Sequence, residues 1–198
     1  MQELNDSLFL LINASAHPSA LMLFIAKLFA EHMIWLVPIG LMVGWLRGGE
    51  RTRKLLLQAT AAGLTGLLIN QLISLVWQHP RPFVVGLGHT FLSHAPDSSF
   101  PSDHLTLQWC VAFSFLMHQR LRAVGALLAL LGLPMAWARI YLGVHFPLDM
   151  VGAALVAGLS ASLCFRQQHW FMATVYRGAT RLYHQLFAIP IRRGWVRY

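Results

Sequence analysis

Two short motifs in the chain combine histidines with serine, arginine and carboxylate side chains. The first is the tetrapeptide 101–104, Pro-Ser-Asp-His. In the second, five residues separate Arg139 from His145, and three separate His145 from Asp149. A third piece, Arg81 followed by proline, lies upstream. Side chains of these types can hold a phosphate, attack it and protonate the group that leaves, so the motifs indicate phosphoryl transfer.

The spacing of His145 and Asp149 is compatible with nucleophilic catalysis. A histidine can attack phosphorus when its distal nitrogen is unprotonated, and a carboxylate bonded to the other ring nitrogen fixes that tautomer. Pro147 suits the first turn of a helix, which places Asp149 in that turn and His145 just before it. The structural alternative is an acidic residue that favours a helix N-terminus, next to an ordinary loop histidine.

Ser102 and His104 stand where a loop leads into a predicted helix. Pro101 breaks the loop, Ser102 can act as the N-cap, and the free amides of the first turn form an anion site. His104 would then project towards a bound phosphate as a general acid. An ordinary cap followed by an interfacial histidine explains the same residues.

The rest of the chain has the composition of a membrane protein. Of its 198 residues, 57% are hydrophobic and 11% charged, whereas a soluble domain carries about 25% charged residues. We predict a single all-α domain, residues 1–198, that forms an integral membrane helical bundle of five to six transmembrane helices. Five apolar stretches approach the roughly 20 residues needed to cross a bilayer: they are residues 20–46, 55–77, 104–118, 121–138 and 147–165.

The third and fourth stretches are short, so their helices are expected to extend beyond these limits. Residues 1–19 are predicted to be an N-terminal interfacial segment, and residues 20–165 the transmembrane core. Residues 166–198 are predicted to be a basic cytoplasmic tail. Within that tail, the mixed aromatic and basic stretch 168–188 favours an interfacial helix over a sixth span.

The distribution of basic residues predicts the orientation of the bundle. With five spans, the basic segments 47–54, 119–122 and 166–198 share one side, which is therefore cytoplasmic. Both motif loops, 78–103 and 139–146, then meet on the opposite, extracytoplasmic side. The same distribution accounts for the net charge of +8 without any nucleic-acid partner.

Arg81 and Arg139 are the only arginines on the predicted outer side. Their guanidinium groups offer paired donors to phosphate oxygens. The alternative is that both side chains extend to lipid headgroups at the membrane surface, which is less favoured for the only two arginines on a charge-poor side.

The combined pattern resembles the signature of the type-2 phosphatidic acid phosphatase superfamily of membrane lipid phosphatases. That signature is Lys-x6-Arg-Pro, Pro-Ser-Gly-His and Ser-Arg-x5-His-x3-Asp. Arg81 and Pro82 match the end of the first part. Asp103 replaces glycine in the second part, and Ala138 replaces serine in the third. The resemblance covers residues 20–165.

The resemblance implies a role for each matching residue. His145 would be the nucleophile that forms a phosphohistidine, Asp149 would orient it, and His104 would protonate the leaving oxygen. The substrate phosphate would be bound by three further side chains, those of Arg81, Arg139 and Ser102. The family works without a metal or other cofactor, and no histidine or carboxylate cluster here has metal-ligand spacing.

One departure from the signature concerns charge. The family lysine falls at Ser74, so the phosphate site has one cation fewer than the pattern. Lys27, in the first span, could supply the missing charge, although Glu31 one turn later could instead pair with it. Asp103 adds a negative charge beside His104. We include Lys27 and Asp103 among the candidate phosphate-binding residues.

Within the superfamily, segments 79–83 and 95–104 are similar to the undecaprenyl pyrophosphate phosphatases linked to bacitracin resistance. This similarity implies hydrolysis of undecaprenyl pyrophosphate to undecaprenyl phosphate and inorganic phosphate, which recycles the lipid carrier of cell-envelope and peptidoglycan synthesis. The expected partners are a polyprenyl pyrophosphate substrate and membrane lipids. The expected place is the inner membrane, with the active site facing the periplasm.

Other functions remain open at this point. Phosphatidylglycerophosphate, phosphatidic acid or diacylglycerol pyrophosphate could be hydrolysed by the same residues. A haem-binding membrane cytochrome could use His104 and His118, which lie on one predicted helix, but it needs matching histidines and only His32 is available. A transporter would suggest broken helices in two related halves, which the sequence does not show.

Overall fold

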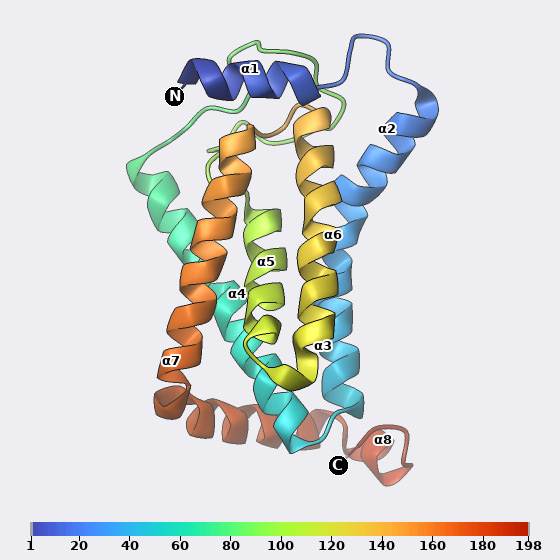
Figure 1. Ribbon diagram of the computed structural model, residues 1–198. Coiled ribbons are helices and arrows are strands. Elements are labelled where there is room, and N and C mark those ends of the chain that lie inside the picture. The colour runs from blue at the N-terminus through green and yellow to red at the C-terminus, as the bar shows by residue number, and fades with distance from the viewer. Residues whose placement is uncertain (1, 198) are drawn as a thin grey trace.

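The computed structural model describes residues 2–197, which form an all-α bundle as predicted and contain no strand (Figure 1). Its helical elements are α1 (Gln2–Ile12), α2 (Ala20–Lys27), the π-helical η1 (Leu28–His32), the 3-10 turn η2 (Met33–Trp35), α3 (Leu36–Arg47), α4 (Glu50–Val76), α5 (Asp103–Leu116), the 3-10 turn η3 (Gln119–Leu121), α6 (Arg122–Tyr141), α7 (Pro147–Leu186) and α8 (Ala188–Arg192).

Four helical stretches in the described part of the chain are long and apolar enough to cross a membrane. They are Ala20–Arg47, Glu50–Val76, Gln119–Tyr141 and Pro147–Leu186. The protein is therefore a multi-pass membrane protein. The first of these stretches is assembled from α2, η1, η2 and α3, which follow one another without a gap.

Helix α5 differs from the prediction for the third span. It has 14 residues, Asp103–Leu116, which is about 21 Å at about 1.5 Å per residue. Apart from Asp103 it does not extend beyond 104–118, contrary to the prediction. Pro101 precedes the helix and η3 follows it closely, so neither end can grow. Figure 1 shows α5 enclosed by α4, α6 and α7, and most of its side chains are buried. Because protein surrounds it, α5 need not match the thickness of the bilayer.

Helix α7 joins two elements that the sequence analysis treats separately. It runs unbroken for 40 residues, so the stretch 168–188, predicted to be an interfacial helix, is the last part of the same helix as the fifth span. Figure 1 shows α7 bending, so that its last part lies across the end of the bundle. Residues 166–167 continue the helix because neither is glycine or proline.

The helices alternate in direction, which gathers the two motif loops at one end of the bundle (Figure 1). Helix α1 lies across that same end and is docked on the loops. The ring of Phe9 packs against Phe146 with centroids 5.4 Å apart, and the Leu148 amide donates to Asn5 Oδ1 at 3.1 Å. The N-terminal segment therefore covers the site region.

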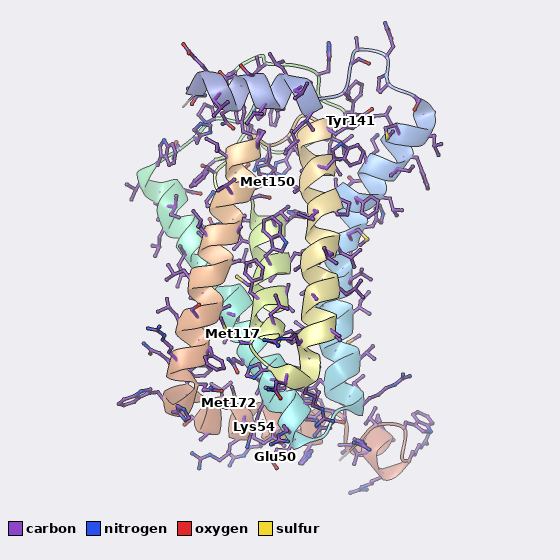
Figure 2. All side chains as sticks on the ribbon, in the orientation of Figure 1. Glu50, Lys54, Met117, Tyr141, Met150 and Met172 are labelled. Carbon is purple, nitrogen blue, oxygen red and sulfur yellow. The ribbon has the colours of Figure 1, made fainter. Side chains whose placement is uncertain are left out.

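The opposite end carries much of the basic charge. Figure 2 shows Glu50 and Lys54 there, and these two residues form an ion pair at 2.6 Å. Arg53 is buried beside them, where it donates to Trp45 O at 3.0 Å and to Arg197 O at 2.8 Å. Its guanidinium lies 4.4 Å from the ring centroid of Tyr183. Through these contacts Arg53 holds the C-terminal segment against the N-terminal end of α4.

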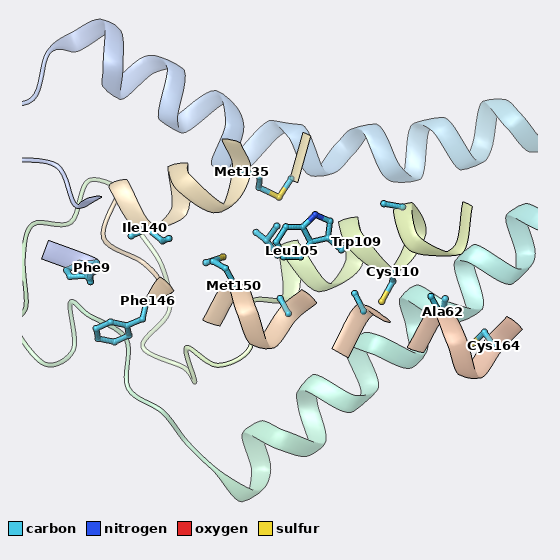
Figure 3. Close-up of a cluster of buried hydrophobic side chains, with 14 residues drawn as sticks. Phe9, Ala62, Leu105, Trp109, Cys110, Met135, Ile140, Phe146, Met150 and Cys164 are labelled. Carbon is cyan, nitrogen blue, oxygen red and sulfur yellow. The ribbon is translucent and has the colours of Figure 1, made fainter. Parts of the chain in front are cut away.

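The main hydrophobic core lies between these two ends (Figure 3). Side chains from α1, α4, α5, α6 and α7 meet in it, among them Phe9, Leu105, Trp109, Met135 and Met150. The two cysteines, Cys110 and Cys164, are buried in the same cluster as free thiols, which agrees with their interpretation as packing residues. This core fixes the α5, α6 and α7 ends that carry the motifs.

Candidate active site

His145 lies in the tight loop between α6 and α7 and is only 1% exposed. The loop depends on Gly143, whose φ of +81° is one that side chains with a Cβ rarely adopt. A Cβ at this position would lie 2.2 Å from the carbonyl oxygen of His89. The short turn therefore places His145 directly above the ends of both helices.

The carboxylate of Asp149 holds one ring nitrogen of His145. Asp149 sits in the first turn of α7, as predicted, with Oδ2 3.1 Å from His145 Nδ1. The same oxygen accepts from the Phe146 amide at 2.8 Å and from the Ser99 hydroxyl. With its position fixed by two other donors, Asp149 can set the orientation of the imidazole.

The other ring nitrogen of His145 faces two arginines. Nε2 lies 3.1 Å from Arg81 Nη1 and 3.3 Å from Arg139 Nη2. A guanidinium can only donate hydrogen bonds, so Nε2 carries the lone pair and Nδ1 carries the proton given to Asp149. Burial, followed by the charges of Arg139 and Arg81, holds the pKa of His145 well below its ordinary value. The imidazole is therefore neutral, with Nε2 aimed between the two arginines.

Arg81 is locked in place by the chain around it. Its Nε donates to Asp97 Oδ1 at 2.9 Å, its Nη1 to Val144 O at 2.8 Å, and its Nη2 to Ser98 O at 3.2 Å. The side chain is 5% exposed. A buried and fully bonded guanidinium rules out the alternative in which Arg81 extends to lipid headgroups.

Arg139 approaches the same point from the last turn of α6. It is buried, and its Nη1 donates to Ala30 O at 3.1 Å. Its Nη2 also lies 3.3 Å from His94 Nε2. The guanidinium thus connects the first span, the 77–102 loop and His145 rather than reaching to the membrane surface.

A cavity of about 200 Å³ opens beside His145. It is formed by the last turns of α4, the 77–102 loop, the start of α5 and the end of α6. Its lining contains Gln71, Ser74, Arg81, His94, Asp97, Ser98, Pro101, Asp103, His104, Arg139 and His145. His104 and His145 therefore face one space, together with both arginines, which is the arrangement that a nucleophile and a general acid require.

Ser102 does not reach this cavity. It occupies the N-cap position of α5, as predicted, although its hydroxyl makes no capping hydrogen bond. The hydroxyl is fully buried without a partner in the described part of the chain. Only the backbone of Ser102 contributes, with its amide 3.4 Å from Asp149 O. The structure does not support a phosphate contact from this side chain.

Asp103 lines the cavity but is turned towards α4. Its carboxylate accepts from Asn70 Nδ2 at 2.8 Å and from Gln71 Nε2 at 3.4 Å. Because the carboxylate and a phosphate are both negative, Asp103 does not bind the phosphate directly. Its position instead defines one wall of the cavity.

Lys27 stays outside the cavity, on the exposed side of α2. Within the described residues it forms no ion pair with Glu31 either, so the alternative interpretation of a structural pair is also wrong. Ala26 and Ala30 are the buried residues of this segment. The first span contributes to the site through the carbonyl of Ala30, which accepts from Arg139.

Sequence reasoning missed three residues of the 77–102 loop, Ser99, His94 and Asp97. Ser99 is fully buried, and its hydroxyl reaches Asp149 and lies 3.4 Å from His145 Nδ1. Burial is the main cause that lowers the pKa of His94. Asp97 neutralises Arg81. A signal existed for two of them, because His94 and Asp97 are ionisable residues on the charge-poor side.

The histidines of the cytochrome alternative do not assemble. His104 faces the cavity, whereas His118 follows the other end of α5 and its Nε2 lies 3.0 Å from Gln58 Oε1. His32 is exposed in η1. Within residues 2–197, no three histidine, cysteine or acidic side chains are grouped to hold a metal ion.

A buried histidine between two arginines and a carboxylate, inside a helical membrane bundle, is suited to transfer of a phosphoryl group. Residues 54–173, more than half of the chain, match the family model of the PAP2 superfamily. The chain belongs to this superfamily of membrane phosphatases, as its motifs predict.

Two relatives are similar in sequence over most of the chain. YbjG of Escherichia coli (strain K12), which bears the provisional name undecaprenyl-diphosphatase, is 40% identical over 200 residues, covering 100% of this chain and 99% of that protein. The undecaprenyl-diphosphatase BcrC of Bacillus subtilis (strain 168) is 38% identical over 163 residues, covering 82% of this chain and 83% of BcrC.

Solved structures share the fold. The crystal structure of Aquifex aeolicus LpxE has a TM-score of 0.63 and 27% identity, covering 82% of this chain and 95% of that chain. The PAP2-type phosphatidylglycerolphosphate phosphatase of Bacillus subtilis has a TM-score of 0.58 and 20% identity, covering 86% of this chain and 87% of that one. The second likeness concerns the fold alone.

Proposed function

We propose that this protein hydrolyses undecaprenyl pyrophosphate to undecaprenyl phosphate and inorganic phosphate. The names of two relatives, at 40% and 38% identity, support this substrate. The reaction is supported above all by one observation, the placement of His145 Nε2 between Arg81 and Arg139 while Nδ1 rests on Asp149. Recycling of a cell-envelope lipid carrier is the corresponding biological role.

In the first step, His145 Nε2 attacks the terminal phosphorus of the substrate. The bond from this phosphorus to the bridging oxygen breaks, and its electron pair remains on that oxygen. Asp149 stabilises the positive imidazole ring that forms, and Ser99 keeps Asp149 in place. The product of the step is a phosphohistidine.

Arg81 and Arg139 stabilise the charge that develops on the transferred group. Their terminal nitrogens point at Nε2, so the phosphoryl oxygens arriving there meet preset donors. The negative charge of the bound diphosphate favours the protonated form of His104, which lines the same cavity and gives its proton to the departing bridging oxygen. The leaving group is the lipid monophosphate.

In the second step, water replaces the histidine on phosphorus. His104, now without its proton, takes one from the attacking water, as a general acid that reverses its role. The nitrogen–phosphorus bond breaks, inorganic phosphate leaves, and His145 returns to its neutral form. No step needs a metal ion, because the arginines carry the required positive charge.

The charge distribution supports a proposal for the location. Basic residues are concentrated at the end of the bundle where α8 and the bent part of α7 lie, while the candidate site lies at the other end (Figure 1). By the positive-inside rule, this basic end faces the cytoplasm. We therefore place the protein in the bacterial inner membrane, with its active site facing the periplasm.

The test is phosphate release by the purified protein in detergent, with EDTA present throughout. Undecaprenyl pyrophosphate is compared with phosphatidylglycerophosphate, phosphatidic acid and diacylglycerol pyrophosphate at equal concentration, and His145→Ala serves as the blank. The proposal expects the highest kcat/KM for undecaprenyl pyrophosphate. A higher kcat/KM for one of the other lipids would assign that lipid as substrate. Activity that is absent with EDTA and restored by excess Mg²⁺ would overturn the metal-free mechanism.

A further inference from the structure

A second cavity adjoins the candidate active site. Its volume is about 430 Å³, and it lies between the last turns of α4 and the 77–102 loop. Four residues line both cavities: Gln71, Ser74, Asp97 and Ser98. The other residues of its lining are Leu75, Gln78, His79, Pro80, Val84 and Pro96. The two spaces are therefore neighbours that share a wall.

The two cavities differ in charge. Arg81 and Arg139 line the first, whereas the lining of the second contains neither arginine nor lysine. Its polar groups are neutral hydroxyls and amides, apart from Asp97, whose charge is balanced by Arg81. Burial lowers the pKa of His79, which keeps that ring neutral as well.

Some of these neutral groups are free to bind a ligand. In the described part of the chain, neither the Ser74 hydroxyl nor the Gln78 amide takes part in a hydrogen bond. Gln71 makes one long bond, at 3.4 Å, to Asp103. Hydroxyl and amide donors of this kind suit a phosphate that carries a single charge.

The outer edge of the second cavity is apolar. Leu75 is 77% exposed and Val84 is 48% exposed. The neighbouring Val76 and Val85 are exposed too. In a membrane protein, exposed side chains of this type face lipid, so the second cavity leads from the first towards the hydrocarbon phase.

We propose that the second cavity holds the retained phosphate of a lipid diphosphate, and that Ser74 determines this specificity. The inference rests on the proposed function and deepens it. The terminal phosphate lies in the first cavity against Arg81 and Arg139, the bridging oxygen passes Ser74, and the prenyl chain leaves along Leu75 and Val84.

The charge difference also explains how the product leaves. When the bridging bond breaks, its electron pair stays on the bridging oxygen, which takes up the proton from His104, so the retained phosphate keeps a single charge. The second cavity offers no arginine or lysine to hold this phosphate, so the lipid monophosphate is bound only through neutral donors. Inorganic phosphate, by contrast, stays with the arginines until its own release.

A small neutral residue at position 74 is central to this arrangement. A lysine there, as in the family signature, would extend into the wall shared by the two cavities. Its long side chain would narrow the passage, and its charge would favour a single phosphate in the first cavity. Ser74 leaves room for the second phosphate instead.

The experiment compares a diphosphate with a monoester within each variant. The kcat/KM for undecaprenyl pyrophosphate is divided by that for phosphatidic acid, so the fraction of active protein cancels. Ser74→Lys should lower this ratio by about tenfold or more, and Gln78→Leu, which affects only the second cavity, by about tenfold, the effect of one lost hydrogen bond to a charged group. Gln168→Leu, at the other end of the bundle, is the matched control.

The outcomes separate the two proposals. If the wild type prefers the diphosphate and both variants keep the wild-type ratio, the second cavity does not bind the retained phosphate and the inference is overturned while the function stands. If the wild type hydrolyses only monoesters, the proposed function itself is overturned. A lowered ratio in both variants, with an unchanged ratio in Gln168→Leu, supports the inference.

Discussion

Arg81 and His145 lie 64 positions apart in the chain, yet Nη1 of the arginine is 3.1 Å from Nε2 of the histidine. Both side chains are buried, and Arg81 is held by three further hydrogen bonds. Because guanidinium nitrogens only donate, the contact selects Nε2 as the nitrogen with the free electron pair. The orientation of the candidate nucleophile is therefore set before substrate binds.

His145→Ala should abolish turnover, because among the described residues it is His145 whose Nε2 contacts both Arg81 and Arg139. Wild-type protein quenched during turnover of labelled substrate should carry an acid-labile phosphate, and His104→Ala should accumulate more of it by slowing hydrolysis. Denaturing gels of samples treated with mild alkali or with acid measure how much labelled phosphate stays on the protein. Near-normal turnover by His145→Ala would remove His145 from the mechanism.

Asp149→Asn should retain the fold and lose most activity, since an amide can present its NH2 group to Nδ1 and reverse the tautomer. The expected drop in kcat is roughly 10²-fold to 10⁴-fold. Ser99→Ala removes only one bond to the carboxylate and should cost about tenfold. Steady-state kinetics together with melting temperature distinguish these effects from unfolding. Equal loss in both variants would argue against the orienting role of Asp149.

The buried neutral histidines predict a pH dependence of stability. The pKa values of His145 and His94 are lowered from 6.5 in the folded protein, mainly by burial. Below pH 6.5 the unfolded chain therefore binds more protons than the folded one, so stability falls as the pH falls through that range. Melting temperatures between pH 7.5 and 5 should decrease, and His94→Gln should flatten the curve. A flat wild-type profile would contradict the neutral, buried state of these rings.

Lys27→Met should keep normal specific activity, because Lys27 is exposed and lies outside the cavity. Arg139→Met, the matched loss of a cation inside the cavity, should lose at least about a hundredfold in kcat/KM, since it removes a buried donor to the phosphoryl group. For both variants, kcat/KM is expressed per folded molecule. A strong kinetic defect in Lys27→Met would mean that the lysine reaches the phosphate in the substrate complex.

The proposed orientation can be tested with single cysteines. Ala95→Cys, in the 77–102 loop, should react with a membrane-impermeant thiol reagent added to intact spheroplasts. Gln119→Cys, at the opposite end, should react only after the membrane is opened. The native Cys110 and Cys164 are buried and give a low background. The reverse pattern would place the active site in the cytoplasm.

Local spacing and overall hydrophobicity determined much of this protein. Apolar stretches separated by basic segments predict an all-α membrane bundle with both motifs at one end, and the described chain has that arrangement. The pairing of His145 with Asp149 also follows from sequence, because residues four apart at the start of a helix lie on the same side. Such relations depend only on helix geometry.

Contacts between distant segments were decided by the tertiary structure. The rotation of the first span about its axis decides whether Lys27 or Ala30 faces the site, because each residue turns the helix by about 100°. Likewise, the path of the 77–102 loop alone brings Ser99 to Asp149 and leaves the Ser102 hydroxyl buried. Helix packing sets these rotations and paths through many weak contacts spread over the whole bundle, which no short motif records.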